Sequence, residues 1–400
     1  MPHSSTNSVT LLDQRCAVAL SERAQRQRFR ELRVAEPVRV NLADNDYLGL
    51  ANDSAVKAAV AKALAAGPVS ASSSPLVRGY QAAHAELETT LCAWHGFPHG
   101  MLWNTGFMAN QAMLGTLAAP GDLIFADRLM HHSLIAGILK SGAKFTRFPH
   151  NDWDALERLL ETKNETDRIR WVITESVYSM DGDSPDFARL AKLKSKHGFL
   201  WYLDEAHALG WYGPQGQGGA AAAGVTAEVD VLVGTLGKAL GGMGAYALFH
   251  HSDWRDFLVN NAGEFIYSTY LSPLLAAGAT AAIQRMRELS SEAESWRLRS
   301  RRFRAALREQ GWSVPDGDSP IVPIVVGDDR AVCALGRHLR ERGFAVGAIR
   351  PPTVPEGSAR LRISLKAMTA WADLEAFIAE LNIWRAQNPP MLESMMKGAR

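Results

Sequence analysis

Short apolar runs alternate with longer amphipathic stretches along most of the chain. Each short run predicts a buried strand, and each longer stretch with apolar residues three or four positions apart predicts a helix. Strands and helices that alternate at this spacing are typical of a parallel sheet covered by helices on both faces. The expected strands are residues 102–104, 123–126, 144–146, 171–174, 200–204, 229–233 and 243–249.

The two ends of the chain follow a different pattern. An N-terminal stretch, about residues 11 to 32, predicts a helix, and the mixed segment from about residue 314 onward predicts a smaller α+β unit. The fold class is therefore α/β, with a large, mostly parallel sheet domain and a smaller α+β domain at the C-terminal end. The expected division is an N-terminal helix and arm (1–45), a large α/β domain (46–285) and a small domain (286–400).

Composition restricts the classes of function. A hydrophobic fraction of 47% and a charged fraction of 21% are ordinary for a soluble enzyme. The net charge of +1 provides no field that would attract nucleic acid or an acidic membrane, and no apolar stretch is long enough to cross a bilayer. The three scattered cysteines, Cys16, Cys92 and Cys333, lack metal-ligand spacing and are expected to be packing residues in a reducing compartment. We find no signal-peptide pattern and expect a cytoplasmic protein.

The most informative stretch is residues 234–242 (GTLGKALGG), which follows the apolar run 229–233. Desolvation next to a buried strand favours the neutral amine of Lys238, and the neutral amine attacks carbonyl groups. The hydroxyl of Thr235 and the glycine backbone could bind a phosphate. A strand-to-loop connection with a solvated lysine explains this stretch alone equally well.

A second stretch favours the chemical interpretation. The strand 200–204 ends in Asp204, and His207 follows in the sequence DEAH. A carboxylate and a lysine at the ends of neighbouring strands suit a site for pyridoxal 5′-phosphate, where the acid keeps the pyridine nitrogen protonated and the lysine forms a Schiff base. The DEAH motif also occurs in helicase-type ATPases, but these enzymes require a Gly-Lys-Ser/Thr loop upstream of it. The pair Gly237-Lys238 lies downstream and precedes alanine, which excludes the ATPase interpretation.

Two further stretches suit the same cofactor. The strand 102–104 leads into a helix that opens near Gly106 and Phe107, and a small-residue turn of this kind leaves backbone N–H groups free for an anion. His131 also follows a strand at the start of a helix. Such a histidine is usually structural, but its flat ring could stack on a pyridine ring.

Together these motifs resemble the α-oxoamine synthases, a pyridoxal-phosphate family of the aspartate-aminotransferase fold (fold type I). The resemblance is carried by residues 45–50 (NDYLGL), 179–183 (SMDGD), 204–207 (DEAH) and 234–238 (GTLGK), in the order of the family. It spans nearly the whole chain.

The resemblance implies a role for each matching residue. Lys238 would bind the cofactor covalently and move a proton, Asp204 would pair with the pyridine nitrogen, and His131 would stack on the ring. His207 and Ser179 would bind the ring oxygen. The phosphate would be bound by Gly106, Phe107 and Thr235, together with Ser268 or Thr269 from the second subunit of a homodimer. Substrate would be bound by Arg30, Asn45, Thr353 and Arg362, with Arg362 clamping the amino-acid carboxylate.

Within the family, residues 349–357 (IRPPTVPEG) and 359–362 (ARLR) are most similar to the members that serve biotin biosynthesis. This implies a decarboxylative condensation of L-alanine with a pimeloyl thioester carried by coenzyme A or by an acyl carrier protein. The alternatives are a member that uses glycine or another acyl thioester, and a non-catalytic pyridoxal-binding sensor. Every expected catalytic position is filled and no DNA-binding extension is evident, which disfavours the sensor.

Overall fold

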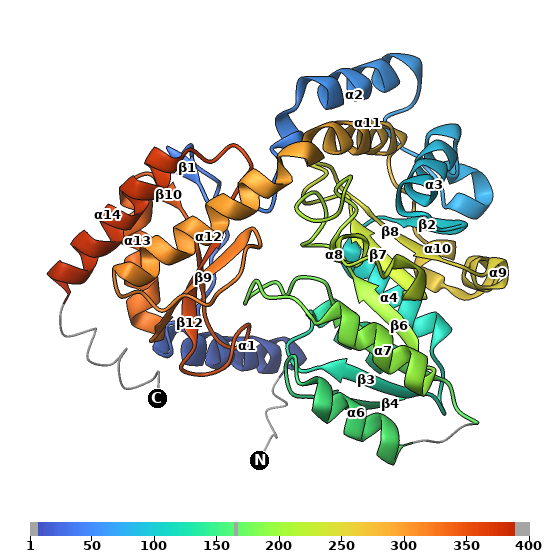
Figure 1. Cartoon of the computed structure of the whole chain (residues 1–400), viewed down its shortest axis with the longest axis horizontal. Coiled ribbons are helices and arrows are strands. Elements are labelled where there is room, and N and C mark those ends of the chain that lie inside the picture. Colours follow the sequence, from blue (N-terminus) through green and yellow to red (C-terminus); the bar gives the residue numbers. More distant parts are fainter. Residues whose placement is uncertain (1–6, 164–166, 389–400) are drawn as a thin grey trace.

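The computed structural model describes residues 7–163 and 167–388, and a seven-stranded sheet forms the centre of its larger part (Figure 1). Its strands are β2 (His99–Trp103), β3 (Leu123–Asp127), β4 (Lys144–Phe148), β5 (Arg170–Glu175), β6 (Leu200–Asp204), β7 (Val231–Thr235) and β8 (Ala245–Phe249). They lie in the order β2-β8-β7-β6-β5-β3-β4. The neighbouring pairs from β7 to β4 are parallel, whereas β8 runs antiparallel to both β7 and β2. The predicted fold class, α/β with a mostly parallel sheet, is confirmed.

Helices cover both faces of this sheet, and polar caps fix where several of them begin (Figure 1). The side chains of Thr105, Asp152 and Asp186 each accept a hydrogen bond from a backbone N–H group three residues later. The helices of this part are α2 (Ser54–Ala66), α3 (Ala82–His95), α4 (Gly106–Leu117), α5 (His132–Ser141), α6 (Trp153–Thr162), α7 (Phe187–His197), α8 (Gly219–Ala222), α9 (Ser252–Asn261), α10 (Gly263–Ile266) and α11 (Pro273–Leu289).

The smaller part contains a three-stranded antiparallel sheet in the order β11-β12-β9. Its elements are α12 (Ala293–Glu309), β9 (Ile321–Gly327), α13 (Asp329–Glu341), β11 (Gly347–Ile349), β12 (Ala359–Ser364) and α14 (Trp371–Gln387). The arm before the large part adds β1 (Val40–Asn41), which pairs in parallel with β10 (Phe344–Ala345). We keep the division into residues 1–45, 46–285 and 286–400 as a proposal; the boundary at residue 285 falls within α11.

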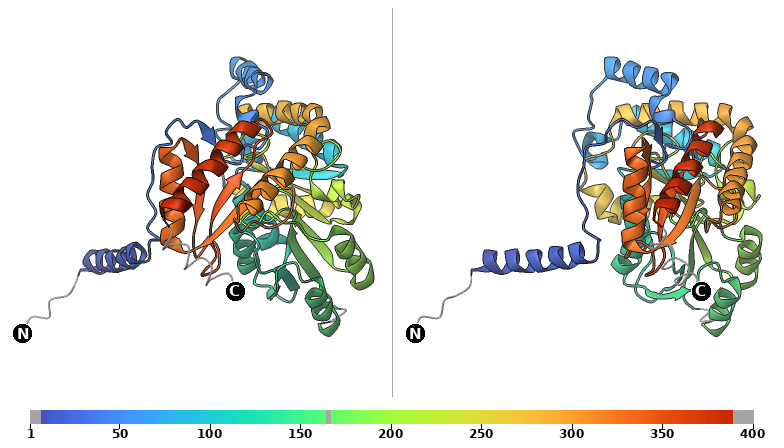
Figure 2. Two further views of the ribbon diagram at one scale, coloured as in Figure 1. Left: turned by 60° about the vertical axis from the view of Figure 1, so that its left-hand side comes forward. Right: turned by 90° about the vertical axis from the view of Figure 1, so that its left-hand side faces the viewer.

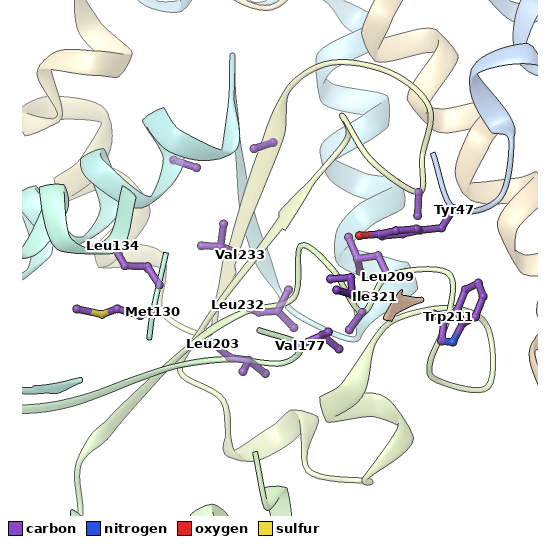
Figure 3. Packing of buried hydrophobic residues seen from close by; sticks show 14 of the residues in the cluster. Tyr47, Met130, Leu134, Val177, Leu203, Leu209, Trp211, Leu232, Val233 and Ile321 are labelled. Carbon is purple, nitrogen blue, oxygen red and sulfur yellow. The ribbon is translucent and has the colours of Figure 1, made fainter. Parts of the chain in front are cut away.

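Apolar side chains from the strands, helices and loops of both the larger and the smaller part form one continuous core. Figure 3 shows part of this core, where Leu232 and Val233 from β7 lie near Leu203 from β6. Close packing also explains one glycine of the lysine stretch. A Cβ atom on Gly234 would lie 2.2 Å from the ring of Tyr246 on the neighbouring strand, so a larger residue there would displace this buried ring.

The N-terminal helix differs from the prediction. It comprises α1 (Ser8–Gln25) rather than residues 11 to 32, and residues 28–38 form an extended arm. Gln27, with a φ of 57°, closely follows the helix, and Arg28 then pairs with Asp329 of α13. No residue of α1 is buried, and the helix projects away from the rest of the molecule (Figure 2). Cys16 is accordingly exposed on α1 and is not the packing residue that we expected.

Across the described parts of the chain, every helix is too short or too polar to span a lipid bilayer.

Candidate active site

Lys238 lies in the turn after β7, at the carboxyl end of the central strands. Its Nζ atom lies 2.8 Å from Nε2 of His207. Burial lowers the pKa of Lys238 to about 8, although the carboxylates of Asp204 and Glu175 favour the charged form. A lysine with this pKa has a substantial neutral fraction in mildly alkaline solution, and the neutral amine is the nucleophile.

Asp204 ends the neighbouring strand, β6, and is almost fully buried. β6 and β7 are parallel neighbours, so Asp204 and Lys238 follow strands that end at the same edge of the sheet. One carboxylate oxygen of Asp204 accepts a hydrogen bond from the side-chain amide of Asn110 (2.8 Å), and the other accepts one from the backbone N–H of Ala206 (2.9 Å). These donors fix the carboxylate in one orientation.

His207 connects Lys238 to a buried tyrosine. Its Nδ1 atom lies 2.6 Å from the hydroxyl of Tyr47, and the Tyr47 hydroxyl also lies within hydrogen-bond distance of Oδ1 of Asn45 (3.1 Å). Burial, together with the nearby positive charges of Lys238 and Arg362, lowers the pKa of His207 well below its usual value. His207 is therefore neutral over the physiological pH range.

The start of α4 faces the same region. The first turn of a helix leaves its N–H groups without intrahelical acceptors, and Gly106 and Phe107 occupy that turn. A Cβ atom on Gly106 would lie 3.8 Å from the side chain of Thr235, so the helix start and Thr235 are adjacent. The Thr235 hydroxyl donates to the carbonyl of Gly244 (3.1 Å) and accepts from the N–H of Gly237 (3.2 Å). A helix start of this kind attracts anions, so this corner suits a phosphate group.

His131 caps α5 with its side chain, and its Nδ1 atom lies 2.7 Å from the hydroxyl of Ser133. Its backbone N–H donates to Glu175, a buried acid at the end of β5. Burial and the nearby charge of Asp204 raise the pKa of Glu175 well above its usual value. Burial also lowers the pKa of His131, which favours a neutral ring that can stack.

These residues enclose a cavity of about 180 Å³. Seven of the predicted site residues line it: Gly106, Phe107, His131, Asp204, His207, Thr235 and Lys238. They come from the ends of several strands and from the starts of the following helices, which is where α/β sheets bind ligands.

A second group of predicted residues lies beside this cavity. The Arg362 guanidinium donates to the backbone carbonyl of Ser179 (2.6 Å), to Oδ1 of Asn45 (3.0 Å) and to the hydroxyl of Ser364 (2.9 Å). Asn45 shares its oxygen with Tyr47, which contacts His207, so hydrogen bonds connect Arg362 to Lys238. Ser179 contacts Arg362 and does not line the cavity.

Arg360 lies on the same face of β12 as Arg362 but has a different partner. It forms an ion pair with Asp181 (2.5 Å) and donates to the carbonyl of Met180 (3.2 Å). Both arginines therefore bind the loop of residues 179–183 (the SMDGD loop).

The large part holds the other end of the SMDGD loop through His150. Its two ring nitrogens contact Asp183 (2.8 Å) and Asp127 (2.9 Å). Burial opposes the charged form, but the two carboxylates outweigh it and raise the pKa of His150 to about 10. His150 is therefore protonated at neutral pH.

Four predicted residues lie elsewhere in the chain. Arg30 donates to the hydroxyl of Thr353 (3.2 Å), and this pair lines a separate cavity of about 330 Å³. Ser268 lies in a small pocket with Trp103 and Asn104, and Asn104 donates to the carbonyl of Thr269 (2.7 Å). Neither Ser268 nor Thr269 lines the cavity around Lys238 of the same chain.

Sequence reasoning missed three residues of the site: Asn110, Tyr47 and Glu175. Asn110 bridges Asp204 and Ser133 and accepts from Tyr202, and it lies one turn into the helix that opens at Gly106. Tyr47 lies within the motif 45–50. It is the one residue of that motif with a hydroxyl group, and this could have marked it as a candidate hydrogen-bonding residue of the site. Glu175 ends an apolar strand, as Asp204 does, and this placement could have revealed it.

The site suits pyridoxal 5′-phosphate on its own geometry. A lysine with a lowered pKa faces the cavity, an oriented carboxylate lies beside it, and free helix N–H groups lie at one side. These are an amine for the aldehyde, an acid for the ring nitrogen and an anion site for the phosphate. The buried carboxylate of Asp204 also lacks an ion-pair partner among the described residues, as expected if a ligand supplies the positive group.

Comparisons with known proteins agree with this site. Residues 37–381 match the family model described as aminotransferase class I and II. The chain is 41% identical over 343 residues to the 8-amino-7-oxononanoate synthase of Trichlorobacter lovleyi, an alignment that covers 84% of this chain and 86% of the relative. It is also 41% identical over 379 residues to the 8-amino-7-oxononanoate synthase of Methylococcus capsulatus, covering 91% and 97% respectively.

A solved structure shows the same similarity in three dimensions. The serine palmitoyltransferase of Sphingomonas wittichii superposes with a TM-score of 0.88 at 27% identity, covering 96% of this chain and 99% of that one. The family model spans most of the chain, and the two curated relatives share about two fifths of their residues with it. The chain therefore belongs to the class I and II aminotransferases, the pyridoxal-phosphate enzymes of fold type I, and within them to the α-oxoamine synthases.

Proposed function

We propose that this protein is an acyltransferase that condenses L-alanine with a pimeloyl thioester, giving 8-amino-7-oxononanoate, carbon dioxide and a free thiol as a step of biotin biosynthesis. One observation carries the proposal. Lys238, with its lowered pKa, and Asp204 share one cavity, and hydrogen bonds connect that cavity to Arg362. Relatives that are 38–41% identical over most of the chain and named 8-amino-7-oxononanoate synthase support the choice of substrates.

Pyridoxal 5′-phosphate supplies an electron sink that stabilises negative charge on the amino-acid α-carbon. Asp204 would hold its ring nitrogen, and Gly106, Phe107 and Thr235 would hold its phosphate. His131 would cover the ring, and His207 with Ser179 would bind the ring oxygen.

Arg362 would bind the carboxylate of L-alanine. Its guanidinium now donates to three oxygens, including Oδ1 of Asn45. A carboxylate is a stronger acceptor than an amide oxygen, so the substrate can replace Asn45 as the partner of Nη1. Asn45 would then be free to donate from its amide group to the same substrate.

Lys238 would transfer the proton of the substrate α-carbon. With a pKa of about 8, its Nζ atom can accept a proton from the substrate α-carbon and return it to the product. His207, 2.8 Å from Nζ, holds the amine in place and is itself neutral. Arg30 and Thr353, which are hydrogen-bonded to each other, would bind the pimeloyl thioester.

We further propose a homodimer in the cytoplasm. Ser268 and Thr269 lie away from the cavity of their own chain, so they are available to complete the phosphate site of the other subunit. The three cysteines are free, as is usual in a reducing compartment.

The direct test is product analysis by mass spectrometry. Purified holoenzyme incubated with L-alanine and pimeloyl-coenzyme A or pimeloyl-carrier protein should form 8-amino-7-oxononanoate. Glycine, serine and acetyl-coenzyme A should be poorer substrates. If glycine with acetyl-coenzyme A were the best pair, the proposal would be wrong in favour of an aminoketone synthase for small substrates.

A further inference from the structure

Three polar side chains, Glu157, Glu161 and His197, form a cluster between α6 and α7, which we call the helix-pair cluster. The two helices pack side by side (Figure 1). Glu157 and Glu161 stand one turn apart on α6 and therefore share a face of that helix. His197 is the last residue of α7. One carboxylate oxygen of each glutamate and one ring nitrogen of the histidine all lie within 4.8 Å of one another.

Ion pairs account for the two glutamates of the helix-pair cluster. The Lys196 ammonium donates to Glu157 (2.7 Å) and to Glu161 (3.1 Å), and Arg189 also donates to Glu157 (2.5 Å). The Lys196 side chain is 55% exposed, so its ammonium can move into solvent at little cost. The two carboxylates therefore attract a cation, and the cation that they hold is exchangeable.

These ion pairs do not account for His197. Its side chain is only 9% exposed, and its Nε2 atom is buried without a hydrogen-bond partner among the residues that the structure describes. Oε1 of Glu157 lies 3.8 Å from Nε2, which is too far for a hydrogen bond. Buried polar atoms in folded proteins almost always have a partner. The unpartnered nitrogen beside two carboxylates therefore points to a ligand that binds all three groups.

The three groups are a ligand set that suits zinc. Zn²⁺ binds histidine nitrogen and carboxylate oxygen at about 2.0–2.2 Å in a tetrahedron, which holds neighbouring ligand atoms about 3.3 Å apart. Nε2 of His197 and Oε1 of Glu157 would need to approach by only about 0.5 Å to reach that spacing. Glu161 would move further, and its exposed side chain is free to do so. Magnesium and calcium prefer sets made of oxygen ligands.

We propose that Glu157, Glu161 and His197 bind one zinc ion, with water as the fourth ligand. Zinc would replace the Lys196 ammonium between the glutamates, and Nε2 of His197 would gain the partner that it lacks. The bound ion would tie α6 to α7, the helix that follows the SMDGD loop. This inference is independent of the proposed function, because none of the three ligands lines the cavity around Lys238.

The test is calorimetric titration of the holoenzyme with zinc chloride after treatment with a chelating resin. His197→Ala and Glu161→Gln each remove one ligand, and the second variant changes only an exposed side chain. The matched controls are His251→Ala, at an exposed histidine before α9, and Glu86→Gln, at an exposed glutamate of α3. Circular dichroism and the cofactor absorbance verify that each variant folds and binds the cofactor.

The wild type should bind zinc at this site. Its Kd should rise at least about tenfold in both ligand variants, because even the loss of an outer-shell partner weakens metal sites about 10–100-fold. The Kd should change less than about twofold in both controls. Zinc should also raise the thermal midpoint of the wild type and of the controls more than that of His197→Ala.

Lys196→Gln distinguishes a metal site from a network of ion pairs. Because the Lys196 ammonium competes with zinc for both carboxylates, its removal should lower the Kd for zinc several-fold. Magnesium chloride should give no comparable binding, since the site offers a nitrogen ligand and too few oxygens.

Three results would overturn the inference. They are no binding of zinc by the wild type, equal Kd values in the wild type and both ligand variants, and equal affinities for zinc and magnesium. The first would leave a buried water as the partner of His197, and the last would reduce the helix-pair cluster to an unselective acidic surface. Neither calorimetry nor the thermal midpoint requires turnover, so both are independent of the product analysis that tests the proposed function.

Discussion

At the scale of single residues, burial and hydrogen bonding set the chemistry of the site. Lys238 and His207 both lose affinity for a proton because their surroundings exclude water, while Asp204 keeps an oriented carboxylate between two N–H donors. These surroundings place a lysine with a lowered pKa, a neutral histidine and an oriented carboxylate in one small cavity.

Lys238 should bind the cofactor covalently. Purified wild-type protein should show a visible absorption band that borohydride removes irreversibly, because reduction fixes the lysine–cofactor bond. Lys238→Ala should lose the borohydride-dependent attachment, measured by mass spectrometry of the denatured chain. A wild-type protein that cannot be reconstituted with pyridoxal phosphate would contradict the assignment.

The Asp204→Asn variant should still bind the cofactor but should lose most of its catalytic activity. Without the carboxylate charge, the pyridine nitrogen loses its proton and the electron sink weakens. The exchange of the L-alanine α-proton with deuterated water, followed by NMR, should slow by about 10²-fold or more. Exchange at the wild-type rate would show that Asp204 has another role.

Asn110→Ala tests a residue that the sequence did not reveal. It removes one donor to Asp204 and the acceptor of Tyr202, and it leaves buried polar atoms without partners. We expect a loss of thermal stability equivalent to about 1–3 kcal/mol. We also expect weaker cofactor binding, measured by dialysis against buffer without cofactor. Gln111→Ala, at the next position of the same helix, serves as the control, and equal cofactor loss from both variants would refute this role.

His150 gives stability a defined pH dependence. Its pKa is raised in the folded chain to about 10 from its usual value, so its contribution is fully present below about pH 6.5 and is lost as pH rises toward 10. His150→Gln should therefore destabilise the protein most at pH 6, on the order of 2–4 kcal/mol. Thermal midpoints of both proteins from pH 6 to pH 10 should converge, and a constant difference would contradict this origin.

At the scale of elements, β12 presents two arginines on one face for two different tasks. Arg360 pairs with Asp181, whereas Arg362 contacts Asn45 beside the cavity. Arg362→Lys keeps the charge but loses the paired donors, and it should raise the KM for L-alanine about tenfold or more. Arg360→Lys should raise that KM less and should lower the thermal midpoint. Equal KM effects in the two variants would remove Arg362 as the specific carboxylate ligand.

The sequence predicted the residues of the candidate site that lie at or just after the end of a strand. Lys238, Asp204 and Gly106 each stand at a transition from an apolar run to a polar turn, so local pattern was sufficient. The contacts of Asn110 and Tyr47 depend on residues about 90 and 160 positions away, and no local pattern encodes such pairs. The predicted end of the first helix was wrong because apolar residues continue past Gln25, where the chain instead extends along α13.

At the scale of the whole molecule, the proposed homodimer gives a role to α1 and to the pair Ser268 and Thr269. Most helices in proteins are stabilised by packing of an apolar face, yet α1 buries none of its residues. We expect sedimentation to give a homodimer and expect Ser268→Ala/Thr269→Ala to weaken cofactor binding about tenfold. An active monomer at assay concentration would refute the dimeric site.

The SMDGD loop joins the larger and smaller parts of the molecule, since Arg360 and Arg362 hold it from one side and His150 from the other. The carboxylate of Asp181 and the carbonyl of Ser179 thus contact the same face of β12 that would meet the amino acid. Cofactor and amino acid are consequently expected to be thermodynamically linked through this loop. Because such linkage is reciprocal, L-alanine should lower the Kd of the cofactor by the same factor by which the cofactor lowers the Kd of L-alanine.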